Sequence, residues 1–450
     1  MGMAIRSTRG EVVKLAFQIA SSGEATIWKT DRDGFLAKIY HDPPKKEQVE
    51  KLLVQIGNAP ADPNRKLNHY SWAMPIDLLM DSKSVTPLTH GFLMPHVEGS
   101  VELINVYNAL KRRKLGLGVT WQFLHATAMN LASIVAALHA KDYVVGDMKP
   151  KNILVNSRAL PTLIDCDSMQ TKDQNGKVYF CPVGSEGFTP PELLGKDLNA
   201  TVQSECSDRF RLAVIIFLLL FGEHPFRVSD SSGEPVAVND AIRKGMWRKN
   251  LGSSKRSIPF DCVHPKVQRL FSRCFDTGCE RPQSRPSAKE WQGVLAIAFQ
   301  ELRACPLMPG HYFSAHRGQC SWCDCASRLN YDPFGSSANL VLNAESVKKL
   351  VELACNRTTA TVRGKVSKIS SNKDAIVLWM GKTAANSTVG AFRIVISKAD
   401  LGTRMLLKIE KMVKQVIQVS GTLEVWGRGK VNYPQISLNS KEAIKRFLER

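Results

Sequence analysis

The chain has 450 residues, of which 44% are hydrophobic and 23% are charged, and its formal net charge is +20 at pH 7. This length fits two or three domains, and the composition is that of an ordinary soluble globular protein. It excludes a membrane-spanning helix, because the longest apolar run, Leu212–Phe221, is much shorter than the ~18 residues that a bilayer requires. The 11 cysteines form no small disulfide framework and no signal peptide opens the chain, so we expect a cytoplasmic location.

The positive charge is concentrated near the C-terminal end. Cys355–Arg450 contains 18 lysines and arginines but only 6 acidic residues, a net +12. Such an asymmetry predicts a segment that meets phosphates or another acidic surface. A solvated basic face without a dedicated ligand is the alternative.

The N-terminal stretch Lys14–Tyr40 alternates as strands around a polar turn. Within it, Lys38 lies in an apolar run, where its charge would require a partner. An exposed lysine on an edge strand is the alternative. Further along, Thr120–Ala140 has apolar residues at helical spacing and predicts an amphipathic helix that Thr120 caps.

The central stretch His139–Ser168 places two carboxylates, Asp147 and Asp165, on short turns after apolar runs. Lys149 and Asn152 follow the first carboxylate at +2 and +5. Phosphoryl transfer needs such a set, because one carboxylate accepts the proton of the attacking hydroxyl and a lysine neutralises the γ-phosphate. An amide and the second carboxylate then hold magnesium. The alternative is that both aspartates only cap turns.

The pattern D-x-K-P-x-N-I-L, followed by a strand that ends in aspartate, resembles the catalytic and metal-binding loops of the protein kinases. The resemblance extends in the right order over roughly Val12–Glu301. It implies an α+β, bilobal protein kinase-like fold, with an N-lobe at 1–97 and a C-lobe at 98–301. It also implies a Ser/Thr protein kinase activity that uses ATP and Mg²⁺.

The resemblance implies a role for each residue that matches the motif. Asp147 is the base, Lys149 contacts the γ-phosphate, and Asn152 and Asp165 hold magnesium. Lys38 contacts the α/β-phosphates, and its partner on the following helix is Glu50, which fits better than Glu47.

Further positions follow from their order in the chain. Gly91–Val97 resembles the kinase hinge, with Met94 as the gatekeeper and the backbone of His96 and Val97 against adenine.

Three residues of the second half also match the family. Glu192 would anchor the activation segment by pairing with Arg285, and Thr189 would line the substrate groove. Asp208 would brace the catalytic loop, or would simply cap the buried helix that follows it.

The phosphate loop departs from the family pattern. Ala20, Ser22 and Ala25 stand where kinases have three glycines, and Gly23 is retained between them. Each added Cβ restricts the approach of backbone to phosphate. Ser22 and Gly23 remain the candidate phosphate contacts.

The catalytic and metal loops depart as well. Val145–Gly146 replaces the usual His-Arg, and without that arginine an activation-loop phosphate loses its usual receptor. Asp165–Cys166–Asp167 replaces Asp-Phe-Gly and resembles a bacterial kinase-like group found near tellurite-resistance or stress gene clusters. We interpret Asp167 as a cap, with a second magnesium ligand as the alternative.

A Cys/His module is predicted at 302–330. Cys305, His311, Cys320 and Cys323 have the type and number of ligands that zinc prefers. His316 and Cys325 are competing ligands, and reduced cysteines in a linker are the alternative. Redox chemistry is less favoured, since no thioredoxin-like βαβ pattern surrounds the cysteines.

The basic tail at 345–450 reads as a helix, Glu345–Ala354, after a turn-rich linker, Asn330–Asn343, and before a set of strands. The strands are Thr358–Lys368, Ala375–Met380, Ala391–Ile396, Val416–Trp426 and Val431–Leu438, with a helix-like run, Lys398–Met412, between the third and fourth. This order resembles the OB-fold, a small β-barrel that binds single-stranded nucleic acid or protein.

Candidate contacts in this tail are of two kinds. Aromatic stacking platforms would come from Trp379, Phe392, Trp426 and Tyr433, at least two of which we expect in the core. Phosphate contacts would come from Lys365, Arg393, Arg428 and Lys430.

The leading hypothesis is an ATP- and Mg²⁺-dependent Ser/Thr protein kinase with an OB-like module for single-stranded nucleic acid or a protein partner. The alternatives are a pseudokinase scaffold, which the altered phosphate loop favours, and a nucleic-acid-binding adaptor with a regulatory kinase-like domain.

Overall fold

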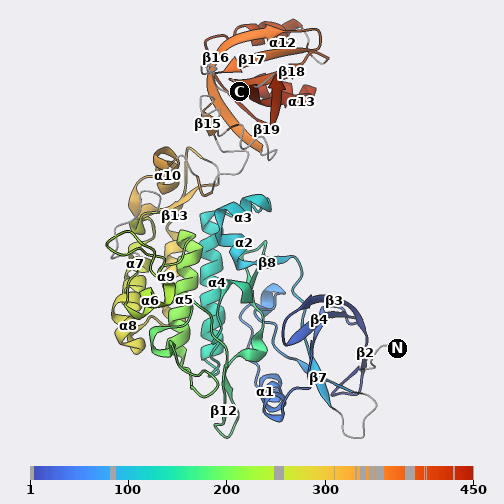
Figure 1. Ribbon diagram of the computed structural model, residues 1–450, viewed down its shortest axis with the longest axis vertical. Coiled ribbons are helices and arrows are strands. Elements are labelled where there is room, and N and C mark those ends of the chain that lie inside the picture. Colours follow the sequence, from blue (N-terminus) through green and yellow to red (C-terminus); the bar gives the residue numbers. More distant parts are fainter. Residues whose placement is uncertain are drawn as a thin grey trace. The chain divides into compact units, whose positions relative to one another are not determined.

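The computed structural model describes residues 5–81, 88–247, 258–308, 310–329, 332–334, 341–343, 350, 359–380, 391–399, 401, 403–428 and 431–448. The chain divides into two compact units, Met1–Tyr331 and Asp332–Arg450, whose elements are labelled in Figure 1. Apart from residue 350, the predicted helix Glu345–Ala354 lies outside the described residues.

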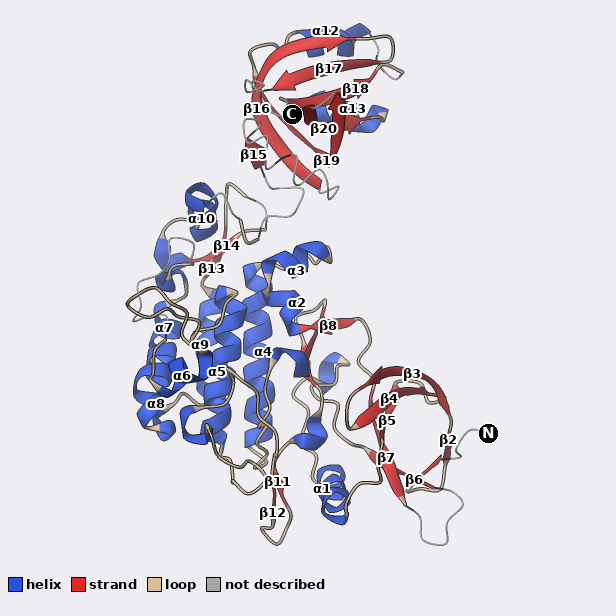
Figure 2. Cartoon of the chain, in the orientation of Figure 1, coloured by secondary structure: helices blue, strands red, loops and turns tan. Residues whose placement is uncertain are grey.

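The first unit begins with a seven-stranded antiparallel sheet, which Figure 2 shows strongly curved. In spatial order its strands are β2 (Val12–Val13), β1 (Ile5–Ser7), β6 (Asp77–Asp81), β7 (Thr89–Pro95), β5 (Phe35–Tyr40), β4 (Ala25–Thr30) and β3 (Leu15–Ser21). Helix α1 (Lys46–Gly57) buries Leu52 in one apolar cluster with Leu36, Leu78 and Phe92 of the sheet.

Lys38 is carried into the middle of this sheet. Its strand, β5, pairs with β4 on one side and with β7 on the other, so the edge-strand alternative is wrong. Gly91 of β7 permits this pairing, because a Cβ at that position would lie 1.9 Å from the backbone oxygen of Lys38. The Lys38 side chain is only 8% exposed and therefore needs a charged partner.

The C-lobe is mainly helical. Its central helix, α4 (Trp121–His139), packs against α5 (Glu205–Phe221) and α9 (Ala288–Gln300). Thr120 caps α4 as predicted, because its hydroxyl accepts a hydrogen bond from Phe123 N at 3.1 Å. The smaller helices are α2 (Leu103–Tyr107), α3 (Ala109–Lys114), α6 (Val238–Arg243), α7 (Pro265–Ser272) and α8 (Gly278–Glu280), with a π-helical turn at Arg273–Thr277.

Helix α5 corrects one predicted boundary. It begins at Glu205 after Ser204, so Asp208 lies inside its first turn and is not the N-cap. From Leu212 onward the helix is apolar on all sides, and its segment from Ser207 to Phe221 is almost entirely buried, which makes it the core of the lobe.

Short sheets complete the unit. Strands β8 (Ser100–Glu102), β9 (Ile153–Asn156) and β10 (Pro161–Leu163) form one, and β11 (Thr171–Lys172) pairs with β12 (Val178–Tyr179). The hairpin β13 (Leu302–Ala304)–β14 (Tyr312–Ser314) precedes α10 (Ser321–Leu329). Among the helices that the structure describes, none has the length and apolarity needed to cross a bilayer.

The elements of the second unit whose bounds the structure describes are one six-stranded sheet and the helices α12 and α13. Its strands are β15 (Val341–Asn343), β16 (Thr359–Ser371), β17 (Ala375–Met380), β18 (Phe392–Ser397), β19 (Val416–Arg428) and β20 (Val431–Leu438), with α12 (Thr403–Glu410) between β18 and β19, and α13 (Lys441–Leu448) after β20. The bounds of β16 to β20 agree with the five predicted strands to within a few residues, whereas β15 lies at the end of the predicted linker Asn330–Asn343. The spatial order is β15-β16-β17-β18-β20-β19, and β19 also pairs with β16. Alternate residues on one face of these strands form a common apolar core.

Candidate active site

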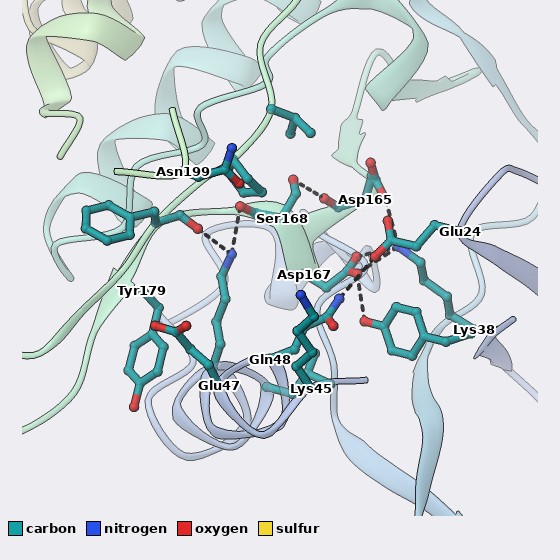
Figure 3. Close-up of a pocket in the computed structure, with 16 residues that line it drawn as sticks. Glu24, Lys38, Lys45, Glu47, Gln48, Asp165, Asp167, Ser168, Tyr179 and Asn199 are labelled. Carbon is teal, nitrogen blue, oxygen red and sulfur yellow. Dashed lines mark hydrogen bonds and ion pairs between the residues drawn. The ribbon is translucent and has the colours of Figure 1, made fainter. Parts of the chain in front are cut away.

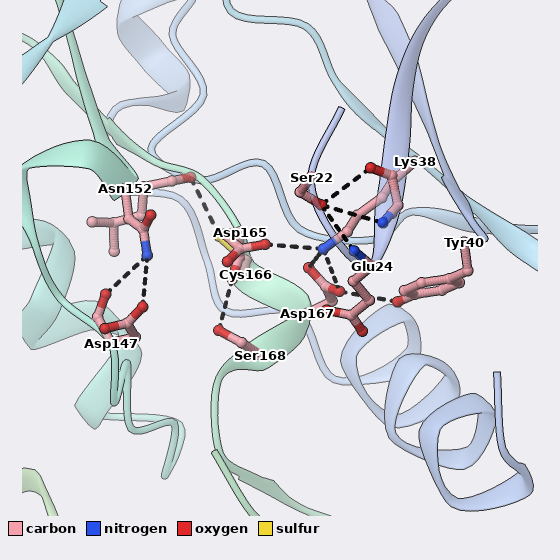
Figure 4. A network of polar contacts seen from close by, with 12 residues as sticks. Ser22, Glu24, Lys38, Tyr40, Asp147, Asn152, Asp165, Cys166, Asp167 and Ser168 are labelled. Atoms are coloured by element: carbon pink, nitrogen blue, oxygen red, sulfur yellow. Dashed lines mark hydrogen bonds and ion pairs between the residues drawn. The ribbon is translucent and has the colours of Figure 1, made fainter. Parts of the chain in front are cut away.

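Asp147 stands in the loop between α4 and β9 and is buried. Its Oδ2 accepts hydrogen bonds from Lys149 Nζ at 2.6 Å and Asn152 Nδ2 at 3.3 Å. Asn152 also donates to the backbone oxygen of Asp147 at 3.0 Å, so its amide oxygen remains available as a ligand (Figure 4). The three residues that the motif singled out therefore lie together.

Ser185 is a site residue that the sequence did not single out. Its hydroxyl donates a hydrogen bond to Asp147 Oδ1 at 2.7 Å and accepts one from Lys149 Nζ at 3.0 Å. Thr189, which we predicted to line the substrate groove, donates to the backbone oxygen of Ser185 at 3.1 Å. A cavity of about 610 Å³ opens beside Lys149 and Ser185 and is large enough for an acceptor side chain.

The backbone before Asp147 is held by Asp208, whose carboxylate accepts hydrogen bonds from Val145 N at 2.6 Å and Gly146 N at 3.0 Å. Burial alone would raise the pKa of Asp208, but hydrogen bonds and charges from His139 and Arg211 outweigh it and lower the pKa. Its stabilising contribution is therefore present above the pKa of an unfolded aspartate and is lost as the pH falls.

Gly146 occupies the position where the family has arginine. Its φ is +74°, in the left-handed region, and a Cβ would lie 2.4 Å from Cys181 Sγ. Glycine is needed here for both backbone conformation and space.

Lys38 points at the metal loop. Its ammonium donates to Asp165 Oδ1 at 2.9 Å and to both Asp167 oxygens at 2.8 and 2.7 Å, and Tyr40 Oη donates to Asp167 at 3.0 Å (Figure 4). Burial alone would lower the pKa of Lys38, but the charges of Asp167 and Asp165 outweigh it and raise the pKa above its ordinary value. Asp167 is thus an ion-pair partner rather than the cap we predicted.

The predicted partner of Lys38 is also corrected. Glu50 does not lie on the face of α1 that meets the metal loop. Its carboxylate instead accepts a hydrogen bond from Lys177 Nζ at 2.7 Å and a longer one from Tyr179 Oη at 3.4 Å. The charge on Lys38 is instead neutralised by the metal loop.

The face of α1 that meets the metal loop carries Lys51 and Gln55. Lys51 Nζ donates to the backbone oxygens of Ser168 and Phe180, each at 2.9 Å. Gln55 Nε2 donates to the backbone oxygen of Cys166 at 2.9 Å. The helix therefore holds the metal loop and the following segment by hydrogen bonds to their backbone.

The turn between β3 and β4 is the segment that corresponds in sequence order to the phosphate loop of the protein kinases. Ser22 Oγ donates to the backbone oxygen of Ala25 at 3.1 Å and accepts from its amide at 3.2 Å, which closes the turn. Glu24 accepts a hydrogen bond from Gln48 of α1 at 3.1 Å. An added Cβ at Gly23 would meet no atom within 4 Å, so small side chains fit this turn without clash.

The hinge lies at the end of β7. Met94 is buried in the N-lobe core beside Leu36. The amide of His96 donates to the backbone oxygen of Gly34 at 2.8 Å, so it is already engaged within the lobe and is not a free donor for adenine. Val97 follows this contact directly.

The activation segment is anchored by a buried ion pair. Arg285 donates to both oxygens of Glu192, at 2.7 and 2.8 Å, as the resemblance implied. It also donates to the backbone oxygens of Gly278 and Cys206 at 2.8 and 2.9 Å. Such bidentate pairing with further hydrogen bonds is what makes a buried arginine tolerable.

The Cys/His cluster gathers the four predicted ligands. The ligand atoms of Cys305, His311, Cys320 and Cys323 all lie within 4.8 Å of one another. His316 instead contacts Ser314 and the backbone of Asp261, and Cys325 is not in the cluster. Tetrahedral thiolate and imidazole ligation needs such a separation of donor atoms. The chemistry of this donor set fits zinc.

This cluster belongs to the first compact unit. Trp322 lies between two of the cluster cysteines in the sequence and is fully buried. Its ring packs edge-on against Trp121, the first residue of α4, with centroids 4.9 Å apart. The cluster therefore packs against the helix that leads to the catalytic loop.

The second unit has an aromatic face. Arg393 stacks on Trp426 with its guanidinium carbon 4.0 Å from the ring centroid and lies 5.6 Å from that of Trp379. Tyr433 contacts both indoles at 5.5 Å. Among the four candidate platforms only Phe392 is in the core, where we expected at least two.

The remaining tail candidates differ in how much is described. Lys365 is exposed on β16. The side chain of Arg428 and all of Lys430 lie outside the described residues.

Residues 98–294 match the family model of the protein kinase domain. The chain is 32% identical over 332 residues to the protein kinase YegI of Escherichia coli strain K12, covering 70% of this chain and 49% of YegI. YegI of E. coli O157:H7 is 31% identical over 338 residues, covering 72% and 50%. The chain thus spans about half the length of these relatives. The solved structure of the ROP18 kinase domain in complex with AMP-PNP and sucrose is 18% identical, and the match covers 66% of this chain and 86% of that one with a TM-score of 0.43.

Proposed function

Because this chain carries a protein kinase domain of the bacterial kinase-like family, we propose that it transfers the γ-phosphate of ATP to a serine or threonine hydroxyl of a protein. The observation that carries the proposal is the cluster of Lys149 and Asn152 on Asp147, with Asp165 and Lys38 in the adjoining loop and strand. These are the groups that in-line phosphoryl transfer requires.

Each group has a defined task in this reaction. Asp147 accepts the proton of the substrate hydroxyl that receives the phosphate. The Ser185 hydroxyl already donates a hydrogen bond to Asp147, as that substrate hydroxyl would. Lys149 and Lys38 neutralise phosphate charge, while Asp165 and the amide oxygen of Asn152 suit a hard divalent cation. These two residues would hold magnesium, which would neutralise part of the phosphate charge.

The test is transfer of radiolabel from Mg-ATP to a general protein acceptor, with wild type and Asp165→Ala compared. Transfer by wild type that is lost in Asp165→Ala supports the kinase. Nucleotide-dependent thermal stabilisation without transfer would instead identify a nucleotide-binding scaffold, the reading that Ala20, Ser22 and Ala25 favour. If the protein shows neither transfer nor nucleotide-dependent stabilisation, both the kinase and the nucleotide-binding scaffold are contradicted.

We further propose that the Cys/His cluster holds a structural zinc ion. Thiolate and imidazole ligands close such a site, and metal binding then adds to folding stability. Cys320→Ser is expected to lose the metal and to lower Tm by about 5 °C, since the stability that metal binding adds is then lost and 1 kcal/mol shifts Tm by about 2–4 °C in a domain of about 150–250 residues. Elemental analysis and thermal unfolding measure both.

Cys325→Ser is the matched control for this prediction, because the same chemistry is changed outside the cluster. It should keep about one equivalent of zinc. Wild-type protein that contains no zinc and is unaffected by a chelator would contradict the site.

For the second unit we propose an OB-like barrel that binds single-stranded nucleic acid. The pairing of β16 with both β17 and β19, and the helix α12 between the third and fourth strands of the ring, support the barrel. Arg393 supports nucleic acid as the ligand, because this side chain is largely buried on the aromatic face and its Nε has no hydrogen-bond partner among the described residues. Phosphate or a base edge would satisfy that donor.

Arg393→Ala in the full chain is therefore expected to weaken binding to a single-stranded oligonucleotide about tenfold and to reduce the salt slope by about one. Lys408→Ala, which removes one exposed charge from α12, is the control and should change affinity less than twofold. Fluorescence anisotropy at several salt concentrations makes the comparison. Equal effects of the two variants would reduce the interaction to general charge attraction.

A further inference from the structure

We propose that Asp167 is the positioning residue for Lys38, in the place of a glutamate on α1. This inference rests on the proposed kinase activity and names a residue that the activity would depend on. It predicts that the lysine is held ready by the metal loop itself, without any inward movement of an α1 carboxylate. In the usual kinase arrangement a lysine–glutamate pair between strand and helix must form, and helix position controls activity through it.

The first observation is the geometry of the pair. Asp167 is as buried as Lys38, each side chain being 8% exposed, and both of its carboxylate oxygens accept hydrogen bonds from the Lys38 ammonium. Tyr40 donates to the same carboxylate and fixes its orientation. Asp165 also contacts Lys38 but is 45% exposed, so it is free to turn toward a cation while Asp167 retains the lysine.

The second observation is the charge on α1. The charged residue of this helix that contacts the metal loop and the segment after it is a cation, Lys51, which donates hydrogen bonds to the backbone oxygens of Ser168 and Phe180. An anion at that position would face those two oxygens, which is unfavourable. The charges of the usual pair are therefore rearranged, with the anion in the loop and a cation on the helix.

The other carboxylates near Lys38 have other partners or are exposed, which leaves Asp167 as the buried partner of Lys38. A cavity of about 280 Å³ is lined by Lys38 and Asp167 together with Glu24, Glu47, Lys45 and Lys51 (Figure 3). Glu24 is bonded to Gln48, and Glu50 is engaged by Lys177. Glu47 is exposed on the rim and is the remaining rival, which an experiment can separate.

The test compares Asp167→Asn with Glu50→Gln and Glu47→Gln, all isosteric losses of one negative charge. In Asp167→Asn, kcat/KM for ATP should fall about 10- to 100-fold, the worth of a hydrogen bond to a charged group. Asp167→Glu should recover part of the loss. The two helix variants should stay within twofold of wild type.

A second readout separates positioning from general damage. Labelling of Lys38 by an amine-reactive adenosine analogue at one pH, quantified by peptide mass spectrometry, reports whether the side chain is held in its ion pair. Loss of the Asp167 ion pair should raise the labelling rate severalfold, and the helix variants should leave it unchanged. This readout needs no phosphate transfer, so it decides the inference even if the kinase activity fails its own test.

Two results would overturn the inference. One is a loss of activity and a raised Lys38 labelling rate in Glu47→Gln or Glu50→Gln but not in Asp167→Asn. The other is an Asp167→Asn variant whose only change is a higher magnesium requirement, matching Asp165→Asn, which would make Asp167 a metal ligand.

Discussion

Asp147→Asn is expected to reduce the rate of phosphate transfer about 10²- to 10⁴-fold while the protein still binds nucleotide. The asparagine retains the size of the side chain and can still accept hydrogen bonds from Lys149 and Asn152, but it cannot take up the proton of the acceptor hydroxyl. Single-turnover transfer with saturating Mg-ATP measures the chemical step, and thermal shift measures nucleotide binding.

Ser185→Ala is the matched control, because it removes a hydroxyl bonded to the same carboxylate but leaves the base. Its effect on the chemical step should be less than tenfold. Transfer in Asp147→Asn at more than a tenth of the wild-type rate would show that another group serves as base.

Arg285→Met is expected to lower the free energy of unfolding by about 3 kcal/mol, the lower end of the cost of removing one partner from a buried ion pair, because Glu192 is partly exposed. The guanidinium is fully buried, and its loss strands the Glu192 carboxylate and the backbone oxygens of Gly278 and Cys206. Urea unfolding of the full chain, followed by a probe of the first unit, gives the difference.

Glu192→Gln serves as the comparison for this variant. It keeps a side chain of the same shape that accepts one hydrogen bond from Arg285, and Glu192 is 27% exposed, so water relieves part of the change. A loss of about 1–2 kcal/mol is expected. Equal losses for the two variants would mean that the backbone contacts of Arg285 contribute little.

Residues close together in the sequence were placed best by sequence alone. Asp147, Lys149 and Asn152 are five residues apart at most and share one loop, so their spacing nearly fixes their geometry. The strands of the second unit also followed from local alternation.

Partners distant in the sequence were harder to predict. Glu50 and Lys51 are neighbours on α1, and helical periodicity alone does not say which of them faces the metal loop. Rotation by one residue, about 100°, exchanges the two. The consecutive charges of the Asp165–Cys166–Asp167 loop were visible in the sequence, but only the tertiary structure brings Lys38 between them. Ser185 was missed for the same reason, since it lies 38 residues from Asp147.

Gly146 has a consequence for how this protein could acquire control by phosphorylation. An arginine substituted there would need both a left-handed backbone and the volume that Cys181 fills. Gly146→Arg alone should therefore misfold the loop rather than create a phosphate receptor. At least two coupled replacements, one at each position, separate this protein from a phosphate-switched form, and either one made first carries a cost. Selection acting on single substitutions would therefore meet a barrier in that direction.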